Sequence, residues 1–152
     1  MTLRPARSED APAMAQVHAR SFRTGWKAED IDQMMRAPGG FALVVVREAT
    51  VLGFILCRAI AGEAEVLTLA VDPDARGGGV GRVLVEAALR LAEGGGAQTM
   101  FLEVAEDNDI AIRLYEAAGF ERVGKRRGYY AQAEKSSIDA LVYRRPLNTG
   151  LG

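Results

Sequence analysis

The stretch that best indicates the fold is Val71-Asp72-Pro73-Asp74-Ala75-Arg76-Gly77-Gly78-Gly79-Val80-Gly81-Arg82. It joins an apolar strand pattern to a long amphipathic helix pattern. Four glycines fall within the five residues from Gly77 to Gly81. Glycine has no Cβ, so it allows left-handed backbone angles and the close approach of a ligand. A helix that begins here adds unpaired N–H groups and the positive end of its dipole. The stretch therefore predicts an anion cradle suited to a pyrophosphate.

Two familiar phosphate-binding patterns do not fit this cradle. A P-loop ends in Gly-Lys-Ser/Thr, whereas Arg82 and Val83 follow Gly81. A Rossmann fingerprint needs Gly-x-Gly-x-x-Gly at the start of a series of parallel strands, and its third glycine is missing. The pattern present is Arg76-x-x-Gly79-x-Gly81. A tight turn between strand and helix, with spare glycines, is the alternative interpretation.

Composition limits the classes of protein that remain. A chain of 152 residues with 49% hydrophobic and 26% charged residues predicts one globular domain with a substantial core. We expect that domain to span residues 1–147, with a frayed tail over 148–152. The net charge of -1 gives no general attraction to nucleic acid or membrane. The single cysteine, Cys57, excludes an internal disulfide and fits a cytoplasmic protein.

Strand and helix patterns alternate along the rest of the chain. Strands are expected at 2–6, 41–47, 51–59, 64–71, 98–104, 120–123 and 138–143. Helices are expected from about residue 10 to 20, then at 28–36, 80–93 and 108–118. Leu3 should point inward, and a polar link should occupy 131–137. The helix after the cradle repeats apolar residues at i, i+3, i+4 and i+7, which predicts one buried face made by Val80, Val83, Leu84, Ala87, Ala88 and Leu91.

The cradle pattern, following a strand that ends in Ala70-Val71-Asp72-Pro73, resembles the acetyl-CoA signature of the GNAT superfamily of N-acetyltransferases. The order of elements is also similar to that fold. The resemblance implies an α/β (α+β) domain with about four helices and a mixed, mostly antiparallel sheet of about seven strands, splayed in the middle. It implies acetyl-CoA as co-substrate in a V-shaped opening between strands 64–71 and 98–104. No metal is expected, because the chain has no pair of histidines or cysteines.

The same resemblance implies which residues bind the cofactor. N–H groups of residues 77 to 82 would bind the pyrophosphate, and the backbone of Leu69 and Val71 would pair with the pantetheine arm. The Val71 N–H would point at the thioester oxygen and stabilise its developing charge. Family members often carry basic or polar side chains where Gly77 and Gly78 stand, so backbone groups would do most of the binding here. The full set is Leu69, Ala70, Val71, Arg76, Gly77, Gly78, Gly79, Val80, Gly81, Arg82 and Asn108.

The second half of the chain narrows the resemblance. The run from Leu102-Glu103-Val104 to Asn108, followed by Leu114-Tyr115 and Gly119-Phe120, resembles bacterial enzymes that acetylate the N-terminal alanine of a ribosomal protein. The segments 62–71 and 125–130 are similar too. The likeness weakens after Tyr130, where alanine stands in place of an expected proline.

That resemblance implies two catalytic residues, Glu103 as the base and Tyr115 as the acid that protonates the departing thiolate. A rim carboxylate or a structural ion pair is the alternative for Glu103, and a packed core tyrosine is the alternative for Tyr115. Asn108 would cap a helix and also lie near the cofactor. The basic run 125–127 fits a solvated face or a part of the acceptor site. His18 is expected to be a surface or packed residue and not a base, and Cys57 is expected to be a small buried residue.

We therefore expect direct acetyl transfer, in a ternary complex, to a protein N-terminal α-amine, with ribosomal-protein alanine as the acceptor. An α-amine has a pKa near ~8, against ~10.4 for lysine, so a modest base is enough. A small amine, an antibiotic or a lysine side chain is the alternative acceptor. A CoA-binding regulatory module without turnover is the alternative of another class. We expect a monomer or a weak dimer.

Overall fold

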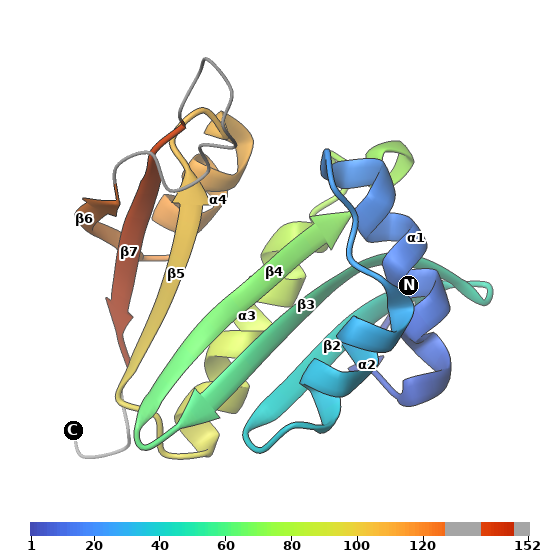
Figure 1. The fold of residues 1–152 in the computed structure, drawn as a ribbon, viewed down its shortest axis with the longest axis horizontal. Coiled ribbons are helices and arrows are strands. Elements are labelled where there is room, and N and C mark those ends of the chain that lie inside the picture. The colour runs from blue at the N-terminus through green and yellow to red at the C-terminus, as the bar shows by residue number, and fades with distance from the viewer. Residues whose placement is uncertain (127–137, 148–152) are drawn as a thin grey trace.

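The computed structural model describes residues 1–126 and 138–147, which share one seven-stranded sheet (Figure 1). The strand order is β1-β2-β3-β4-β5-β7-β6. Only β4 and β5 pair in parallel, and the other neighbours are antiparallel. The strands are β1 (Thr2–Pro5), β2 (Gly40–Arg47), β3 (Thr50–Ile60), β4 (Glu63–Val71), β5 (Thr99–Ala105), β6 (Glu121–Arg126) and β7 (Ala140–Pro146). The expected mixed, mostly antiparallel sheet is confirmed.

Helices cover both faces of this sheet. In Figure 1, α1 (Ala11–Ser21) and α2 (Ala28–Arg36) lie in front of β2 and β3, and α3 (Val80–Gly94) lies behind β3 and β4. The fourth α-helix of the described part, α4 (Asp109–Ala117), packs with α3. Two apolar clusters result, one under α1 and α2 and a larger one under α3 and α4. No helix among residues 1–126 and 138–147 covers the front of β5 and β7.

The sequence predicts the elements better than their ends. β6 and β7 each extend about three residues further toward the C-terminus than expected, because pairing with β7 holds the basic end of β6 in the sheet. Leu3 is 37% exposed rather than inward, since β1 is an edge strand. The expected link at 131–137 and the tail at 148–152 lie outside the described residues.

The buried face of α3 differs from the predicted one. Val83 and Leu91 are exposed, whereas Val85 and Leu89 are buried. The helix lies so close to β3 that a Cβ on Gly53 would come within 2.9 Å of Val80 Cγ1. Packing of α3 against the sheet, which the helix's own pattern does not show, decides which of its residues are buried. The buried residues are Val80, Leu84, Val85, Ala87, Ala88, Leu89 and Ala92.

The sheet opens between β4 and β5. The two strands pair only from Glu63↔Thr99 to Val66↔Leu102, and beyond that they separate, as Figure 1 shows. The register of β3 and β4 shifts at the same level, so Leu67 is an extra residue in β4. A β-bulge of this kind bends its strand and increases its twist. The bulge therefore accounts for the predicted splay in the middle of the sheet.

None of the helices in residues 1–126 and 138–147 has the length and apolar character needed to span a membrane.

Candidate active site

The glycine loop leads from β4 into α3 with the backbone that its sequence predicts. Gly77 and Gly79 both have φ of +84°, and Gly79 is the N-cap of α3. A Cβ built on either residue would meet nothing within 4 Å. The left-handed angles favour glycine at these two positions, and the empty space beside them leaves room for a bound group. The loop thus fits an anion at the N-terminus of α3.

Side chains on either side of the loop hold it in place. Asp72 accepts a hydrogen bond from the Asp74 N–H at 2.9 Å, and Arg20 of α1 donates to Asp72 at 2.7 Å. Within α3, a Cβ on Gly81 would lie 3.0 Å from Leu114 of α4, so this glycine lets the two helices approach closely. These contacts connect the cradle with α1 and α4.

The two arginines of the pattern lie at the surface. Arg82 pairs with Glu86 one turn later on α3, at 3.1 Å, and Arg76 is exposed. Their side chains add positive charge near the loop. The loop backbone, unlike these exposed side chains, has a defined conformation, so its N–H groups are the defined donors of the cradle.

Register shows where the N–H groups of β4 point. The Asp72 N–H donates to Leu52 at 2.8 Å, so the pair Leu52–Asp72 is hydrogen-bonded across β3 and β4. Antiparallel pairs alternate between hydrogen-bonded and non-hydrogen-bonded, and residues 69 to 72 keep one register. The N–H and C=O groups of Leu69 and Val71 therefore point away from β3 and into the opening, whereas Ala70 bonds to β3. The Val71 carbonyl accepts from Ser21 at 3.1 Å.

Glu103 lies on β5 beside this opening, on the front face of the sheet. Its neighbours Leu102 and Val104 point into the cluster under α3, so the Glu103 side chain points the other way. Its Oε2 accepts a hydrogen bond from Arg126 Nη1 at 2.6 Å. Glu103 thus forms an ion pair, as the alternative interpretation expects, and it also lies beside the opening, where the proposed base would have to be. The side chain keeps 26% of its surface exposed.

Tyr115 lies on the opposite face. Its ring is buried in the cluster under α3 and packs edge-to-face on Phe120, with centroids 5.7 Å apart. Burial, with a smaller contribution from Cys57, raises the pKa of the Tyr115 hydroxyl well above its usual value. Among the described residues, the Tyr115 hydroxyl has no hydrogen-bond partner. Every side-chain oxygen or nitrogen of these residues that is fully buried does have a partner. The hydroxyl oxygen therefore keeps some access to solvent.

Asn108 is the N-cap of α4, the helix that carries Tyr115. Its Oδ1 accepts from the Ala111 N–H at 3.1 Å, which is the expected N-cap.

Cys57 is fully buried on β3, and burial raises the pKa of its thiol. It is the packing residue that the sequence predicts. The part of the chain described here holds no group of three or more side chains suited to a metal.

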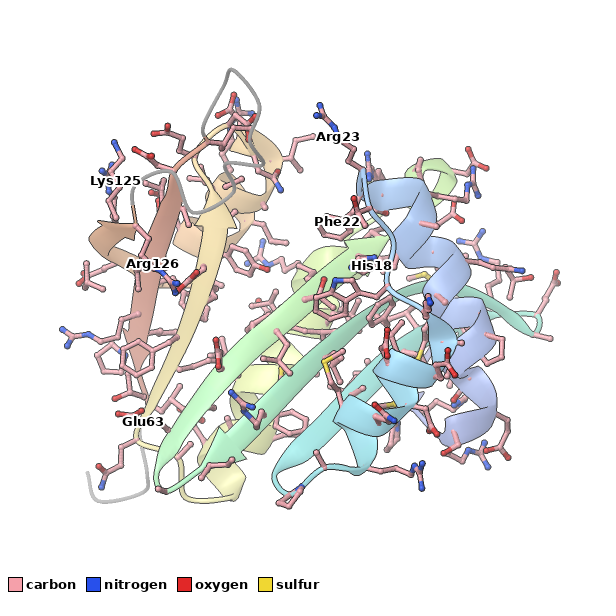
Figure 2. All side chains as sticks on the ribbon, in the orientation of Figure 1. His18, Phe22, Arg23, Glu63, Lys125 and Arg126 are labelled. Carbon is pink, nitrogen blue, oxygen red and sulfur yellow. The ribbon has the colours of Figure 1, made fainter. Side chains whose placement is uncertain are left out.

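An aromatic cluster beside the opening was not identified from the sequence. His18 of α1 is 2% exposed, and its ring stacks on Phe22 and Trp26 at 4.3 and 4.8 Å. Its Nδ1 accepts from the Trp26 N–H at 3.1 Å. Figure 2 shows His18 and Phe22 over the C-terminal end of β4. The sequence carries two partial signals for this cluster. The segment 22–26 resembles a tryptophan-bearing loop of the bacterial N-terminal-alanine acetyltransferases, and His18 stands among apolar residues of α1, which also fits a residue buried for packing alone.

The opening between β4 and β5 and the glycine cradle at the N-terminus of α3 fit an acyltransferase that uses a CoA thioester. The Acetyltransferase (GNAT) family matches residues 11–120, and the chain belongs to this family. It is an N-acetyltransferase, and members of this family use acetyl-CoA.

Relatives within the family cover most of the chain. The N-alpha-acetyltransferase RimI of Mycobacterium tuberculosis is 35% identical over 90% of this chain and 86% of that protein. The [ribosomal protein bS18]-alanine N-acetyltransferase of Salmonella typhimurium is 31% identical over 91% of this chain and 93% of that protein. The crystal structure of the ribosomal-protein-S18-alanine N-acetyltransferase from Escherichia coli superposes with a TM-score of 0.88 at 27% identity, covering 97% and 94% of the two chains.

Proposed function

We propose that residues 1–147 form one domain that transfers acetyl from acetyl-CoA to the N-terminal α-amine of a protein, with alanine of a ribosomal protein as the acceptor. The observation that carries this proposal is the opening between β4 and β5, with Glu103 on one face and Tyr115 on the other. The named activities of the relatives support the choice of acceptor. A ribosomal-protein acceptor would also assign the reaction to the cytoplasm.

Acetyl-CoA supplies an activated acetyl thioester, and the backbone of the chain would hold it in three places. N–H groups of residues 77 to 82 would bind the pyrophosphate, at the positive end of α3. Leu69 and Val71 would pair with the pantetheine arm as a partner strand does, since their polar groups point into the opening. The Val71 N–H would then donate toward the thioester oxygen, where negative charge develops during attack.

Two side chains would act as the general base and the general acid. Glu103, on the front face, would take a proton from the acceptor amine, directly or through water. Tyr115, on the other face, would give its proton to the sulfur as the carbon–sulfur bond breaks. The pKa of this hydroxyl is raised by burial, so it remains protonated until the thiolate forms. The acceptor amine would therefore approach from the front, across the sheet from Tyr115.

Attack by the amine itself fits the chain better than a covalent acetyl-enzyme. Cys57 is the only cysteine of the chain, and burial keeps its thiol protonated. A thiol without its negative charge is a poor nucleophile. We therefore propose that amine and acetyl-CoA are bound together when the acetyl group moves.

A comparison of acceptor peptides tests the proposal. One set carries a free N-terminal alanine and no lysine, and the matched set carries a blocked N-terminus and one internal lysine. Mass spectrometry with acetyl-CoA should detect one added acetyl group in the first set. Modification of lysine peptides alone would replace the proposed acceptor with a side-chain amine. Binding of acetyl-CoA without product from any peptide or small amine would favour a regulatory module.

A further inference from the structure

Arg126, at the end of β6, contacts the candidate base directly. Its Nη1 donates to Glu103 Oε2 at 2.6 Å. In the sheet, β7 lies between β5 and β6, so the arginine side chain crosses a whole strand to reach the carboxylate. Figure 2 shows Arg126 on the front face, over β7, turned toward β5. The contact therefore joins the edge of the sheet to the opening in its middle.

The residues beneath this contact are small enough to let it form. Ala140 of β7 is the register partner of Arg126, and it presents only a methyl group. Val142 stands between Glu103 and Gly124 in the next row, and Gly124 has no side chain to fill the space at the edge. An arginine can extend over such a surface with its methylene groups against the sheet and its charge at the far end.

The fold gains little from this pair. The Arg126 side chain is 49% exposed, and an exposed ion pair contributes only about 0–1 kcal/mol to stability. The pair has a larger effect on where the Glu103 carboxylate lies, because a glutamate side chain rotates about three bonds unless a contact holds it. A catalytic group that moves by about 1 Å can lose roughly 100-fold in rate. The contact thus matters more to the chemistry than to the folding of the domain.

We propose that Arg126 is a positioning residue that orients the Glu103 carboxylate toward the acceptor amine. Arg126 engages Oε2, and within the described residues Glu103 makes no other hydrogen bond or ion pair, so Oε1 is available for the amine or a bridging water. The planar guanidinium fixes the direction of its donors, which the point charge of a lysine does not do. This inference rests on the proposed role of Glu103 as the base.

Lys125 provides a matched control on the same strand. It is the preceding residue, carries the same charge and is also partly exposed. Its ammonium pairs with Glu106 at 3.5 Å and with Asp139 at 3.3 Å, and not with Glu103. Loss of Lys125 therefore removes a charge and ion pairs of β6 without touching the candidate base.

The experiment measures kcat and KM for R126Q, R126K and K125Q, with whichever primary amine the unchanged protein acetylates. R126Q should lower kcat about tenfold, with the KM for acetyl-CoA unchanged, because the carboxylate is present but loosely held. R126K should recover part of that loss, and K125Q should remain within about twofold of the unchanged protein. The melting temperature of each variant reports whether the fold is intact.

A double-mutant cycle then separates positioning from structure. In a Glu103→Gln background, R126Q should cause no further loss of kcat if Arg126 acts through Glu103. The same fractional loss in both backgrounds would overturn the inference and leave the proposed acetyl transfer in place. A rise in kcat for R126Q would also overturn it, since Arg126 would then compete with the acceptor. Full activity of E103Q would remove both the base and its positioning residue, whatever the acceptor screen shows.

Discussion

At the scale of single residues, the two groups proposed to transfer protons lie on opposite faces of the sheet. Glu103 is partly exposed and paired with a cation, whereas Tyr115 is buried among apolar side chains. The first environment keeps a carboxylate close to solvent and to an arriving amine. The second favours the neutral form of a phenol. The division matches a reaction in which one face accepts a proton and the other supplies one.

Tyr115→Phe should lower kcat by about 100-fold or more, because the departing sulfur loses its proton donor. Affinity for acetyl-CoA should stay the same, since the ring and its packing on Phe120 remain. Steady-state kinetics and calorimetry measure the two effects. Tyr143→Phe is the matched control, because that hydroxyl donates to Glu116 at 2.8 Å, away from the opening. It should lose about 1.5–3 kcal/mol of stability, because the lost hydrogen bond is to a carboxylate, and keep its kcat. Full kcat in Tyr115→Phe would exclude the proposed acid.

His18 should make the stability of the protein depend on pH. Burial lowers the pKa of His18 in the folded state, whereas the unfolded chain keeps a value near ~6.5. As the pH falls below that value, the unfolded state binds a proton that the folded state resists. Stability should therefore decline toward acid, by at most about 1.4 kcal/mol per pH unit for this one group.

The asparagine variant isolates this effect. His18→Asn keeps an acceptor near the Trp26 N–H but cannot be protonated in this range. Urea denaturation at pH 7.5 and pH 5 should show a smaller decline for His18→Asn than for the unchanged protein. Equal declines would mean that another group governs the acid sensitivity.

At the scale of elements, the sequence predicts the order of strands and helices because each element carries its own local pattern. The glycine cradle is predictable for the same reason, since left-handed backbone angles favour glycine. The bulge at Leu67 is not predictable, because it depends on how β4 pairs with β3. Contacts between distant segments, such as Trp26 on His18 and Arg126 on Glu103, also leave no periodic signal. The sequence motif therefore predicts Glu103 and Tyr115 as candidates, whereas the residues around them are known only from the fold.

Gly79→Glu should abolish the binding of acetyl-CoA, because it places a bulky anion in the cradle. The residue also has a positive φ, so any side chain there adds roughly 1–2 kcal/mol of strain. Gly62→Glu controls for that strain. Gly62 has a φ of +85° and open space around its Cβ position, and it lies in the turn between β3 and β4. Both variants should lose similar stability, but calorimetry should detect lost affinity only for Gly79→Glu. Unchanged affinity in that variant would contradict the assignment of the loop.

At the scale of the whole molecule, the opening is where the two parts of the sheet meet. β1 to β4 carry α1 and α2 on the front face, whereas no described helix covers the front of β5 and β7 (Figure 1). The bulge in β4 separates these parts at the level where β4 and β5 stop pairing. The side of β4 that faces the opening therefore has polar groups available for a ligand, even though β4 lies in the middle of the sheet.

Hydrogen exchange can test this arrangement residue by residue. In the free protein, the amides of Leu69 and Val71 should exchange much faster than that of Ala70, because only Ala70 bonds to β3. At about 100 times the Kd, acetyl-CoA should slow the two exposed amides by up to roughly 100-fold. The amide of Ala70 should change less, since it is already protected. NMR exchange rates with and without the cofactor measure all three. If the three amides are slowed equally, the cofactor stabilises the whole strand and does not pair with its open edge.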